Sequence, residues 1–301
     1  MIWLDLMLVG LILGLAWRCV HAIELMEAVV VFVALGMLVA LAWARLQAPD
    51  AALAEAAIGA GLAGALLLAT LRQLPAQAVR PQPLHWLWWG LWGLFGVTLL
   101  WAIGSILSTP VSLMPWVNTH LPEAGVSHPV TAVLLNFRAL DTALELAVLL
   151  WAWMAQRALG ESPDTSFHPV QGRVLATAVK ALLPLMGLVA VYVLWRGSSA
   201  PGGAFQSGAV LAAAWLMLWL ADLPGLDPRR WSVRLGWLGG VMVFFLVGLL
   251  GLVQGIGFMG YRPDQATGLI LLIESAAALS IGLLLASMVL ASLPGIKGRR
   301  A

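Results

Sequence analysis

The residues best placed to do chemistry are charged side chains inside long apolar stretches. Arg138, Asp141 and Glu145 lie in the apolar stretch 129–156 at spacings i, i+3 and i+7, which places all three on one face of a helix. Charges inside membrane spans are costly and usually face a bundle interior or a water-filled path. We interpret Asp141 and Glu145 as part of a proton or cation pathway, with Arg138 tuning the pKa. The alternative is a static ion pair of Arg138 and Asp141 that docks neighbouring helices.

Two further carboxylates and one lysine lie inside apolar stretches. Glu55 comes more than one turn after the helix start at Pro49, too deep for helix capping to explain it. Glu274 lies beside Ser275 in the last apolar stretch. For each glutamate, a place in the proton or cation pathway and a role in helix docking both remain open. Lys180 is either a cation partner for such a carboxylate or a snorkelling side chain that reaches the membrane surface.

Asp50 and His128 stand at the ends of predicted helices. Asp50 follows Pro49 at a helix start, where a carboxylate is most simply an N-cap. His128 precedes Pro129 at the outer end of its apolar stretch. A histidine there is a candidate entrance for protons, because it titrates near neutral pH. The commoner alternative is a solvated loop histidine.

Two glycine-rich segments carry weaker signals. Residues 198–208 contain Pro201-Gly202-Gly203 before an apolar stretch, which favours a tight packing turn over an anion site at a helix start. Residues 255–260 match G-x-G-x-x-G literally. We reject a nucleotide site there, because no strand precedes the segment and it lies at a membrane boundary.

The remaining composition excludes several kinds of chemistry. The chain has one cysteine, Cys19, so it holds no internal disulfide and no Cys-ligated iron–sulfur cluster. The five histidines show no metal-ligand spacing. No nucleophile elbow, P-loop or kinase signature is present. We therefore predict no cofactor, no metal, no nucleic-acid partner and no enzymatic activity of this chain alone.

The elements that position these residues are predicted to be membrane-spanning helices. Of 301 residues, 61% are hydrophobic and 10% are charged, against about 25% charged in soluble domains. Runs of about 18 or more nearly uncharged residues are long enough to cross a bilayer as helices. We predict an all-α polytopic bundle of about nine spans: 2–17, 23–45, 50–71, 84–106, 129–156, 175–195, 204–222, 235–256 and 267–292.

Basic residues predict the orientation of these spans. If alternate loops are assigned to opposite sides, one side receives most of the arginines and lysines, which marks it as cytoplasmic. This places the N-terminus outside and the C-terminus in the cytoplasm of a multi-pass plasma (inner) membrane protein. The basic residues on the cytoplasmic side are Arg18, Arg72, Arg80, Arg157, Arg173, Arg229, Arg230, Arg234, Lys297, Arg299 and Arg300, whereas the other side has Arg45, Arg196 and Arg262.

Three segments resemble small membrane subunits of Mrp-type multisubunit cation/proton antiporters and of membrane-bound hydrogenases, both in the complex I superfamily. Segment 46–61 is similar to the A-P-D…E-A-x-x-G-A helix of the hydrogenase small subunit and the tail of the antiporter large subunit. Segment 130–150 is similar to the D-F-R-x-x-D-T-x-x-E helix, and 196–208 to the R-G-H-x-x-P-G-G-G-F turn of the MnhB-type antiporter subunit. The matching residues are Ala48-Pro49-Asp50, Glu55-Ala56 and Gly59-Ala60; Phe137-Arg138, Asp141-Thr142 and Glu145; and Pro201-Gly202-Gly203 with Phe205.

The resemblance implies a fusion of two subunit types. Residues 1–156 would form a five-helix region that is also related to the J subunit of complex I. Residues 157–174 would be a polar linker, and 175–301 a four-helix region of the MnhB type. The chain departs from the family pattern at Asn136 for Asp, at His128 for Asn, at Ser198 and Ser199 for a polar pair beginning with His, and at Ala204 for Gly. The amide at position 136 points to altered ion preference or to a purely coupling role.

The function implied by the resemblance is that of a non-catalytic integral subunit. It would contribute to a proton/cation (Na+/H+) pathway through Asp141, Glu145, Glu55 and Glu274. Its partners would be large antiporter-like membrane subunits, other small Mrp or complex I-like subunits and the lipid bilayer, with a peripheral redox module as an open addition. The alternatives are a stand-alone secondary transporter for a small solute and a purely structural adaptor between larger subunits.

Overall fold

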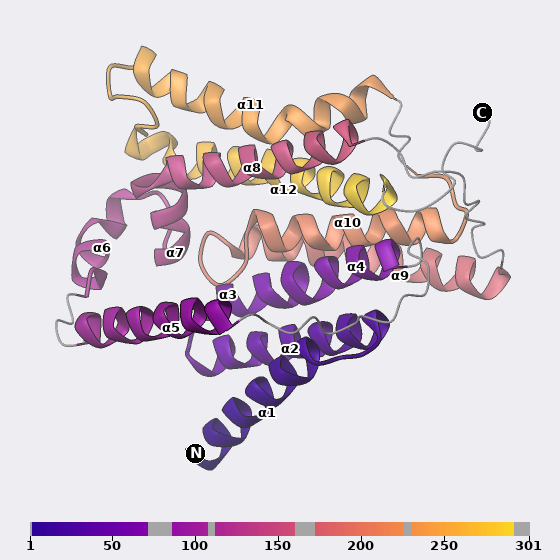
Figure 1. Cartoon of the computed structure of the whole chain (residues 1–301). Coiled ribbons are helices and arrows are strands. Elements are labelled where there is room, and N and C mark those ends of the chain that lie inside the picture. Colours follow the sequence, from indigo (N-terminus) through magenta and orange to yellow (C-terminus); the bar gives the residue numbers. More distant parts are fainter. Residues whose placement is uncertain (1, 72–85, 108–111, 160–171, 226–229, 292–301) are drawn as a thin grey trace.

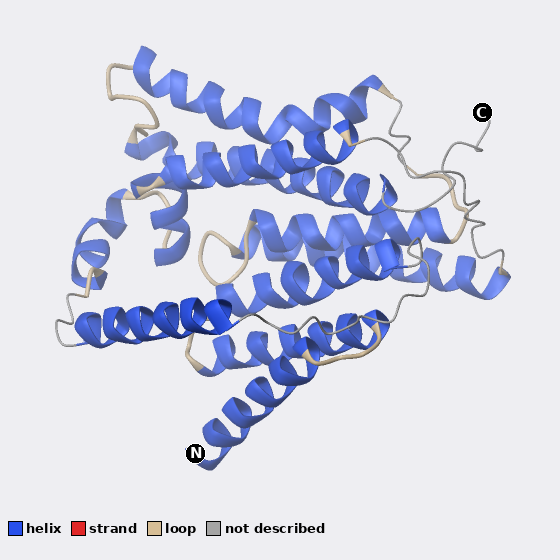
Figure 2. Cartoon of the chain, viewed as in Figure 1, coloured by secondary structure: helices blue, strands red, loops and turns tan. Residues whose placement is uncertain are grey.

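The computed structural model describes residues 2–71, 86–107, 112–159, 172–225 and 230–291. These residues fold into helices and the loops that connect them (Figure 2). The helices of the first part of the chain are α1 (Ile2–Val20), α2 (Leu25–Arg45), α3 (Pro49–Ala54), the π-helix η1 (Glu55–Leu62), α4 (Ala63–Leu71) and α5 (Trp86–Leu107). The short middle helices are α6 (Met114–His120), the 3-10 turn η2 (Leu121–Glu123), α7 (Pro129–Ala132) and the π-helix η3 (Val133–Phe137). The long helices that follow are α8 (Ala139–Ala158), α9 (Arg173–Arg196), α10 (Ala204–Leu220), α11 (Trp231–Val253) and α12 (Pro263–Ala291).

Most of the predicted spans coincide with apolar helices. Six helical segments of the described residues are long and apolar enough to cross a membrane: α1, α2, Pro49–Leu71, α9, α11 and α12. Two shorter apolar stretches, Gly90–Ser105 and Ala204–Leu220, fall on two further predicted spans. The all-α, multi-pass character of the chain is therefore confirmed. Its orientation in the bilayer stays a prediction.

The predicted span 129–156 is not one continuous helix. It consists of α7, the π-helical segment η3 and α8, and Arg138 between the last two adopts φ −129° and ψ 39°. The amide of Arg138 donates to the carbonyl of Val133, five residues back, at 2.7 Å. The hydroxyl of Thr142 donates to the carbonyl of Leu134 at 2.7 Å, which satisfies an acceptor at the break. A wide turn of this kind re-aims the chain that follows.

Helix α12 forms the centre of the bundle. It packs against α8, α10 and α11, and Figure 1 shows it lying between these helices. Ile270, Ile273, Ile281 and Leu284 are its largest fully buried side chains. Burial of this kind is favourable because close-packed side chains gain dispersion contacts that lipid tails supply less well.

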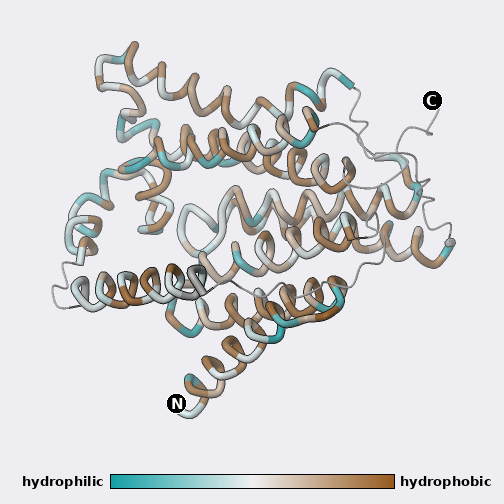
Figure 3. Tube along the Cα trace, in the orientation of Figure 1, coloured by the Kyte–Doolittle hydropathy of each residue, from teal (hydrophilic) through white to brown (hydrophobic). Residues whose placement is uncertain are grey.

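The first helices lie at the edge of the described bundle. Helix α1 has no buried residue and packs on α2 (Figure 1). Arg45 at the end of α2 donates to Asp5 of α1 at 2.9 Å, which ties the two helices together near one end. Figure 3 shows that α1 is apolar along much of its length. An apolar, uncovered helix is typical of a surface that faces lipid or another membrane subunit.

Candidate functional site at the junction of three segments

Three segments that are far apart in the sequence meet around Asp50. The Oδ2 atom of Asp50 in α3 lies 2.9 Å from Nε2 of His128, which immediately precedes α7. The amide of Gly202, in the turn before α10, donates to Oδ1 of Asp50 at 3.1 Å. One carboxylate thus joins α3, the start of α7 and the start of α10.

The interpretation of Asp50 as an N-cap is wrong. The N-cap residue of α3 is Ala48, and no side chain caps the helix. Asp50 lies one position inside the helix after Pro49, and its carboxylate contacts His128 and Gly202 in the other segments. Sequence reasoning missed this role because a local explanation for the residue was at hand.

His128 is a partner of Asp50 rather than a solvated loop histidine. Its side chain is only 14% exposed. The backbone amides of Ser127 and His128 both donate to the carbonyl of Ser198, at 3.0 and 3.1 Å. The segment before α7 is thereby held against the turn before α10. Whether His128 also admits protons stays a prediction.

The glycine-rich turn at 197–203 is a tight packing turn. It also binds an anionic group, the carboxylate of Asp50. Gly202 and Gly203 have φ values of +154° and +120°, which only glycine adopts without strain. A Cβ atom on Gly202 would stand 2.4 Å from the carbonyl oxygen of Val193. The hydroxyl of Thr131 donates to the carbonyl of Gly197 at 2.5 Å, so α7 fixes the turn from another side.

Glu274, in the middle of α12, lies against the same turn. It is 3% exposed. Its Oε1 atom lies 3.1 Å from the positions where Cβ atoms on Gly197 and Gly203 would stand, so side chains at these two positions would crowd the carboxylate. Its Oε2 atom has no hydrogen-bond partner in the described chain. The structure therefore brings Glu274 and the Asp50 junction to the same turn.

Glu55 begins the π-helical segment η1, next to α2 and α10. Its carboxylate folds back over Gly59, where a Cβ atom would stand 2.4 Å from Oε1 of Glu55. The glutamate is partly buried. Both π-helical segments, η1 and η3, fall in stretches that carry the subunit motifs, and such wide turns are frequent at functional sites.

Arg138, Asp141 and Glu145 form a separate group on α8. Arg138 Nη2 lies 2.5 Å from Oδ2 of Asp141, and their side chains are 69% and 44% exposed. Glu145 follows one turn later and is exposed. Arg138 is the N-cap residue of α8, so it precedes the helix that carries the two carboxylates. The ion pair of Arg138 and Asp141, one of the two alternatives, is present.

Two other candidate residues lie apart from the carboxylates. Lys180 is exposed on α9, and no ion pair joins it to an acidic residue of the described ranges. Asn136 of η3 donates its side-chain amide to the carbonyl of Ala124 at 3.1 Å. It therefore anchors the loop before α7, which a carboxylate without a proton could not do.

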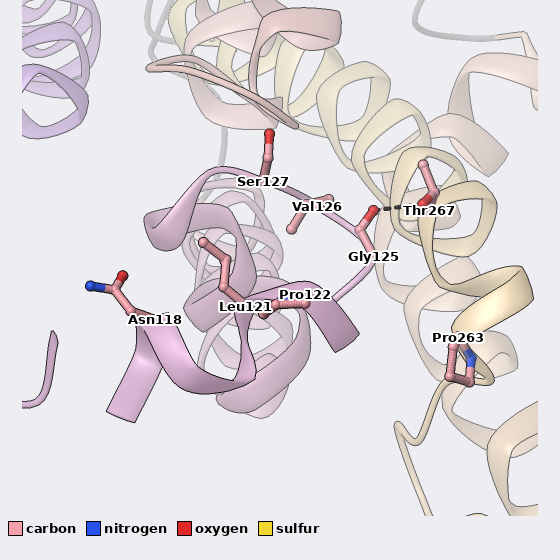
Figure 4. A pocket seen from close by; sticks show the side chains of 8 residues that line it. All are labelled: Asn118, Leu121, Pro122, Gly125, Val126, Ser127, Pro263 and Thr267. Atoms are coloured by element: carbon pink, nitrogen blue, oxygen red, sulfur yellow. Dashed lines mark hydrogen bonds between the residues drawn. The ribbon is translucent and has the colours of Figure 1, made fainter. Parts of the chain in front are cut away.

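A shallow open pocket of about 560 Å³ lies between that loop and the start of α12. Its lining includes no charged side chain, and the hydroxyl of Thr267 donates to the carbonyl of Gly125 across it at 2.6 Å (Figure 4). None of the acidic candidates lines it. The pocket thus offers no charged group for cation chemistry.

Comparisons with known proteins identify two parts of the chain. Residues 10–76 match the MbhD family, the D subunit of MBH, and residues 174–293 match the domain related to the MnhB subunit of Na+/H+ antiporter. The chain is thus similar to MbhD in its first part and to the MnhB-related domain in its last part. The resemblance inferred from the three motifs is confirmed. The finer division into 1–156, 157–174 and 175–301 stays a prediction, and residues 160–171 of the predicted linker lie outside the described residues.

Two solved structures are similar to this chain. A chain of the Mrp complex from Dietzia sp. DQ12-45-1b aligns over 98% of this chain and 35% of its own length, with a TM-score of 0.76 and 21% identity. A chain of the membrane-bound sulfane sulfur reductase (MBS), an archaeal respiratory membrane complex, aligns over 67% of this chain and 98% of its own, with a TM-score of 0.53 and 25% identity. No curated protein matches the chain.

The junction links the two named domains. Asp50 lies in the range that matches MbhD, and Gly202 and Glu274 lie in the range that matches the MnhB-related domain. His128 comes from the segment between the two matched ranges. The contacts of Asp50 therefore hold the MbhD domain, the intervening segment and the MnhB-related domain together at one point.

Proposed function

We propose that this chain is a non-catalytic integral subunit of an Mrp-like or complex I-like ion-translocating assembly in the plasma (inner) membrane. In that assembly it contributes to a proton/cation (Na+/H+) pathway through Glu274, Glu55, Asp141 and Glu145. Its partners are large antiporter-like subunits and other small subunits of the same kind. A peripheral redox module is compatible with this proposal, since MBS is a respiratory complex.

The observation that carries the proposal is that this chain aligns with only part of a much longer chain of the Mrp complex. The whole of this fold corresponds to only 35% of the Mrp-complex chain, so a chain of this size supplies one part of a larger membrane arm. The MnhB-related domain adds a second link to Na+/H+ antiporters. A part of such an arm is expected to need the remaining subunits for transport.

The exposed charges on α8 support the need for partners. Asp141 and Glu145 are interleaved with apolar side chains, among them Leu144 and Val148, which are 63% and 67% exposed. A helix face of this composition cannot face lipid alone without a large cost for its charges. Contact with a polar surface of another membrane subunit removes that cost.

Co-purification tests the subunit proposal. The tagged chain is isolated from its native membrane in mild detergent, and the accompanying proteins are identified by mass spectrometry. We expect large antiporter-like membrane subunits, with iron–sulfur proteins in addition if the assembly is redox-driven. A chain that emerges alone and monodisperse contradicts the proposal and favours a stand-alone transporter.

The exposed Arg138–Asp141 pair also favours a second candidate, a purely structural adaptor that docks larger subunits. Neutral variants separate the two. If Asp141 and Glu145 conduct ions, Asp141→Asn and Glu145→Gln lower cation-dependent proton flux in membrane vesicles about tenfold, the effect of about 1.4 kcal/mol on a barrier. If flux is unchanged while deletion of the chain prevents assembly, the adaptor function is correct.

A further inference from the structure

The end of α8 meets the start of α11 through an arginine and two tryptophans. The guanidinium of Arg157 lies 5.4 Å from the centre of the Trp153 ring and 5.9 Å from that of the Trp237 ring. The two rings pack against each other, with centroids 4.3 Å apart. Figure 1 shows the last turns of α8 beside the first turns of α11. An arginine that contacts two aromatic rings is restrained in position, because each ring attracts its charge.

The surroundings of Arg157 are fixed from the bundle interior. Trp237 is buried, and its indole N–H donates to the hydroxyl of Ser287 in α12 at 3.1 Å. Gln156, the neighbour of Arg157 in α8, donates to the carbonyl of Met288 in α12 at 2.8 Å. The position of the guanidinium is therefore set by three helices, α8, α11 and α12.

The charge of Arg157 has no acidic partner within the described chain. The residue is exposed, and no ion pair joins it to a described carboxylate. A contact with an aromatic ring engages the charge of a guanidinium but not its N–H donors. These donors have the planar arrangement that binds two oxygens of one phosphate or carboxylate group. Arg157 is thus held in place with its donors available to an anion.

Two more arginines lie next to the ring that Arg157 contacts. Arg234 comes one turn before Trp237 on α11, and Arg230 is the N-cap residue of that helix. Residues three or four apart on a helix are neighbours. Both arginines are exposed, and neither forms an ion pair with a described residue. Arg157, Arg230 and Arg234 are named the arginine surface below.

The arginine surface concentrates positive charge where the helix itself disfavours it. Arg230 and Arg234 flank the first turn of α11, and the dipole of a helix makes its N-terminus partly positive. Like charges that lie close together also repel one another. An anion bound among the arginines removes both costs.

Exposed apolar side chains continue from the arginine surface along both helices. On α11, Leu238 and Met242 follow Arg234 at intervals of four residues and are exposed. On α8, Met154 is exposed one turn before Arg157. Positions three and four apart share a helical face, so each of these arginines stands at the end of an apolar stripe. A soluble anion would use the charges alone, whereas a phospholipid would use the charges and the stripes.

The arginine surface is separate from the face of α8 that is proposed to contact other subunits. Arg157 follows Val148 by nine residues, which is about two and a half turns, so the two residues lie on opposite sides of the helix. A subunit that docks at Asp141 and Val148 therefore does not occupy the arginine surface. The predicted orientation places these arginines at the cytoplasmic surface, where anionic lipids attract basic segments.

We propose that the arginine surface binds the phosphate group of an anionic phospholipid from the surrounding bilayer, with the acyl chains against the apolar stripes of α8 and α11. Basic sites between membrane helices hold lipid headgroups in this way. An anionic lipid is preferred over a zwitterionic one because the arginines lack a negative partner and the zwitterionic headgroup brings a positive charge of its own. The bound lipid joins α8 to α11 at one end of the bundle. This proposal requires only that the chain lies in a membrane.

Photolabelling tests the lipid site. The protein is isolated from its native membrane with the chains that accompany it. It is placed in detergent micelles that contain phosphatidylglycerol or phosphatidylcholine, each with the same photoreactive acyl chain. After illumination, mass spectrometry of the peptides from α8 and α11 measures the yield of attached lipid. We expect phosphatidylglycerol to label these peptides about tenfold more than phosphatidylcholine, which corresponds to about 1.4 kcal/mol of binding preference.

Matched variants locate the headgroup. Arg157→Gln and Arg234→Gln each reduce the preference for phosphatidylglycerol, and the double variant abolishes it. Arg173→Gln removes one exposed arginine at the start of α9, on the same predicted side of the membrane, and keeps the full preference. Arg157→Lys retains the charge without the planar donors and gives an intermediate preference. If the double variant does not assemble, the wild-type comparison and the single variants still decide.

Three results overturn the proposal. Equal labelling by the two lipids means that the site does not select charge. An equal loss of preference in Arg173→Gln means that the basic surface as a whole, and not this site, attracts the lipid. Displacement of phosphatidylglycerol by inorganic phosphate, but not by sodium chloride at the same ionic strength, means that the arginines bind a soluble anion. None of these readings depends on co-purification or on flux, so a failed lipid site leaves the subunit proposal standing.

Discussion

At position 136, an amide nitrogen in place of a carboxylate oxygen replaces a negative charge with a hydrogen-bond donor. The family pattern has Asp where this chain has Asn136, whose amide hydrogen is used in a bond to the carbonyl of Ala124. An ionised carboxylate has acceptors only and would face that carbonyl with like partial charge. Asn136 therefore holds the loop before α7 in place. A proton relay leading to Asp141 would have one acidic group fewer than in the family pattern.

Restoring the family carboxylate is expected to cost stability. Asn136→Asp replaces the donor with an acceptor and leaves the carbonyl of Ala124 unpaired, which is expected to lower the free energy of unfolding by about 1–3 kcal/mol. Thermal unfolding in detergent measures the change. Asn118→Asp, at an exposed position, is the matched control and should unfold like the wild type. Equal stability of the two variants would show that the Asn136 bond contributes nothing.

Helix α12 is held by close approach of backbones as well as by its buried isoleucine and leucine side chains. A Cβ atom on Gly208 of α10 would stand 2.7 Å from Cγ2 of Ile281 and 3.0 Å from the carbonyl of Ala278. On the other side, a Cβ on Gly240 of α11 would stand 2.9 Å from that of Ser280. In membranes, where lipid is as apolar as a side chain, such small-residue contacts are a main source of helix association.

A single methyl group at this contact should loosen the bundle. Gly208→Ala overpacks the crossing of α10 and α12 and is expected to destabilise the protein by about 1–3 kcal/mol. Gly239→Ala, in α11 where a Cβ would meet no atom within 4 Å, should be neutral or stabilising by about 0.5–1 kcal/mol. Unfolding in detergent compares the two. A Gly208→Ala protein as stable as Gly239→Ala would mean that the helices separate easily.

Across the whole molecule, contacts far apart in sequence join the two halves. Gly202 donates to Asp50, Gln156 donates to the carbonyl of Met288 at 2.8 Å, and Thr267 donates to that of Gly125. These bonds lie at separate places along the bundle. They add polar specificity to the apolar packing of α8 and α10 on α12.

Separated halves are therefore expected to reassemble. When residues 1–159 and 172–301 are expressed together as two chains, a tag on one half should recover the other. Asp50→Ala removes a carboxylate whose bonds cross the junction, and is expected to lower recovery about tenfold, given about 1.5–3 kcal/mol for hydrogen bonds to a charged group. Asp5→Ala, which breaks a pair within the first half, should leave recovery unchanged. No recovery of the wild-type halves would mean that the domains associate only as one chain.

Properties that depend on neighbours along the chain were readable from the sequence. Apolar runs predicted the spans, because a helix buries its own backbone groups and needs only length and hydropathy to cross a bilayer. The motif segments predicted the MbhD and MnhB-related domains, which the comparisons confirm. The carboxylate of Glu274 was singled out because its charge is costly in any apolar surrounding.

Tertiary structure decided what those residues touch. The sequence suggested that Asp50 is a local helix cap and gave no indication of a role for Gln206. Both form hydrogen bonds with segments about 150 positions away along the chain. The break at Arg138 depends on bonds to Val133 and Leu134 that no hydropathy pattern encodes. The sequence determined which stretches enter the membrane, because that choice depends on each stretch alone. Only the fold decided which polar groups meet there, because a hydrogen bond depends on two partners and the packing that brings them together.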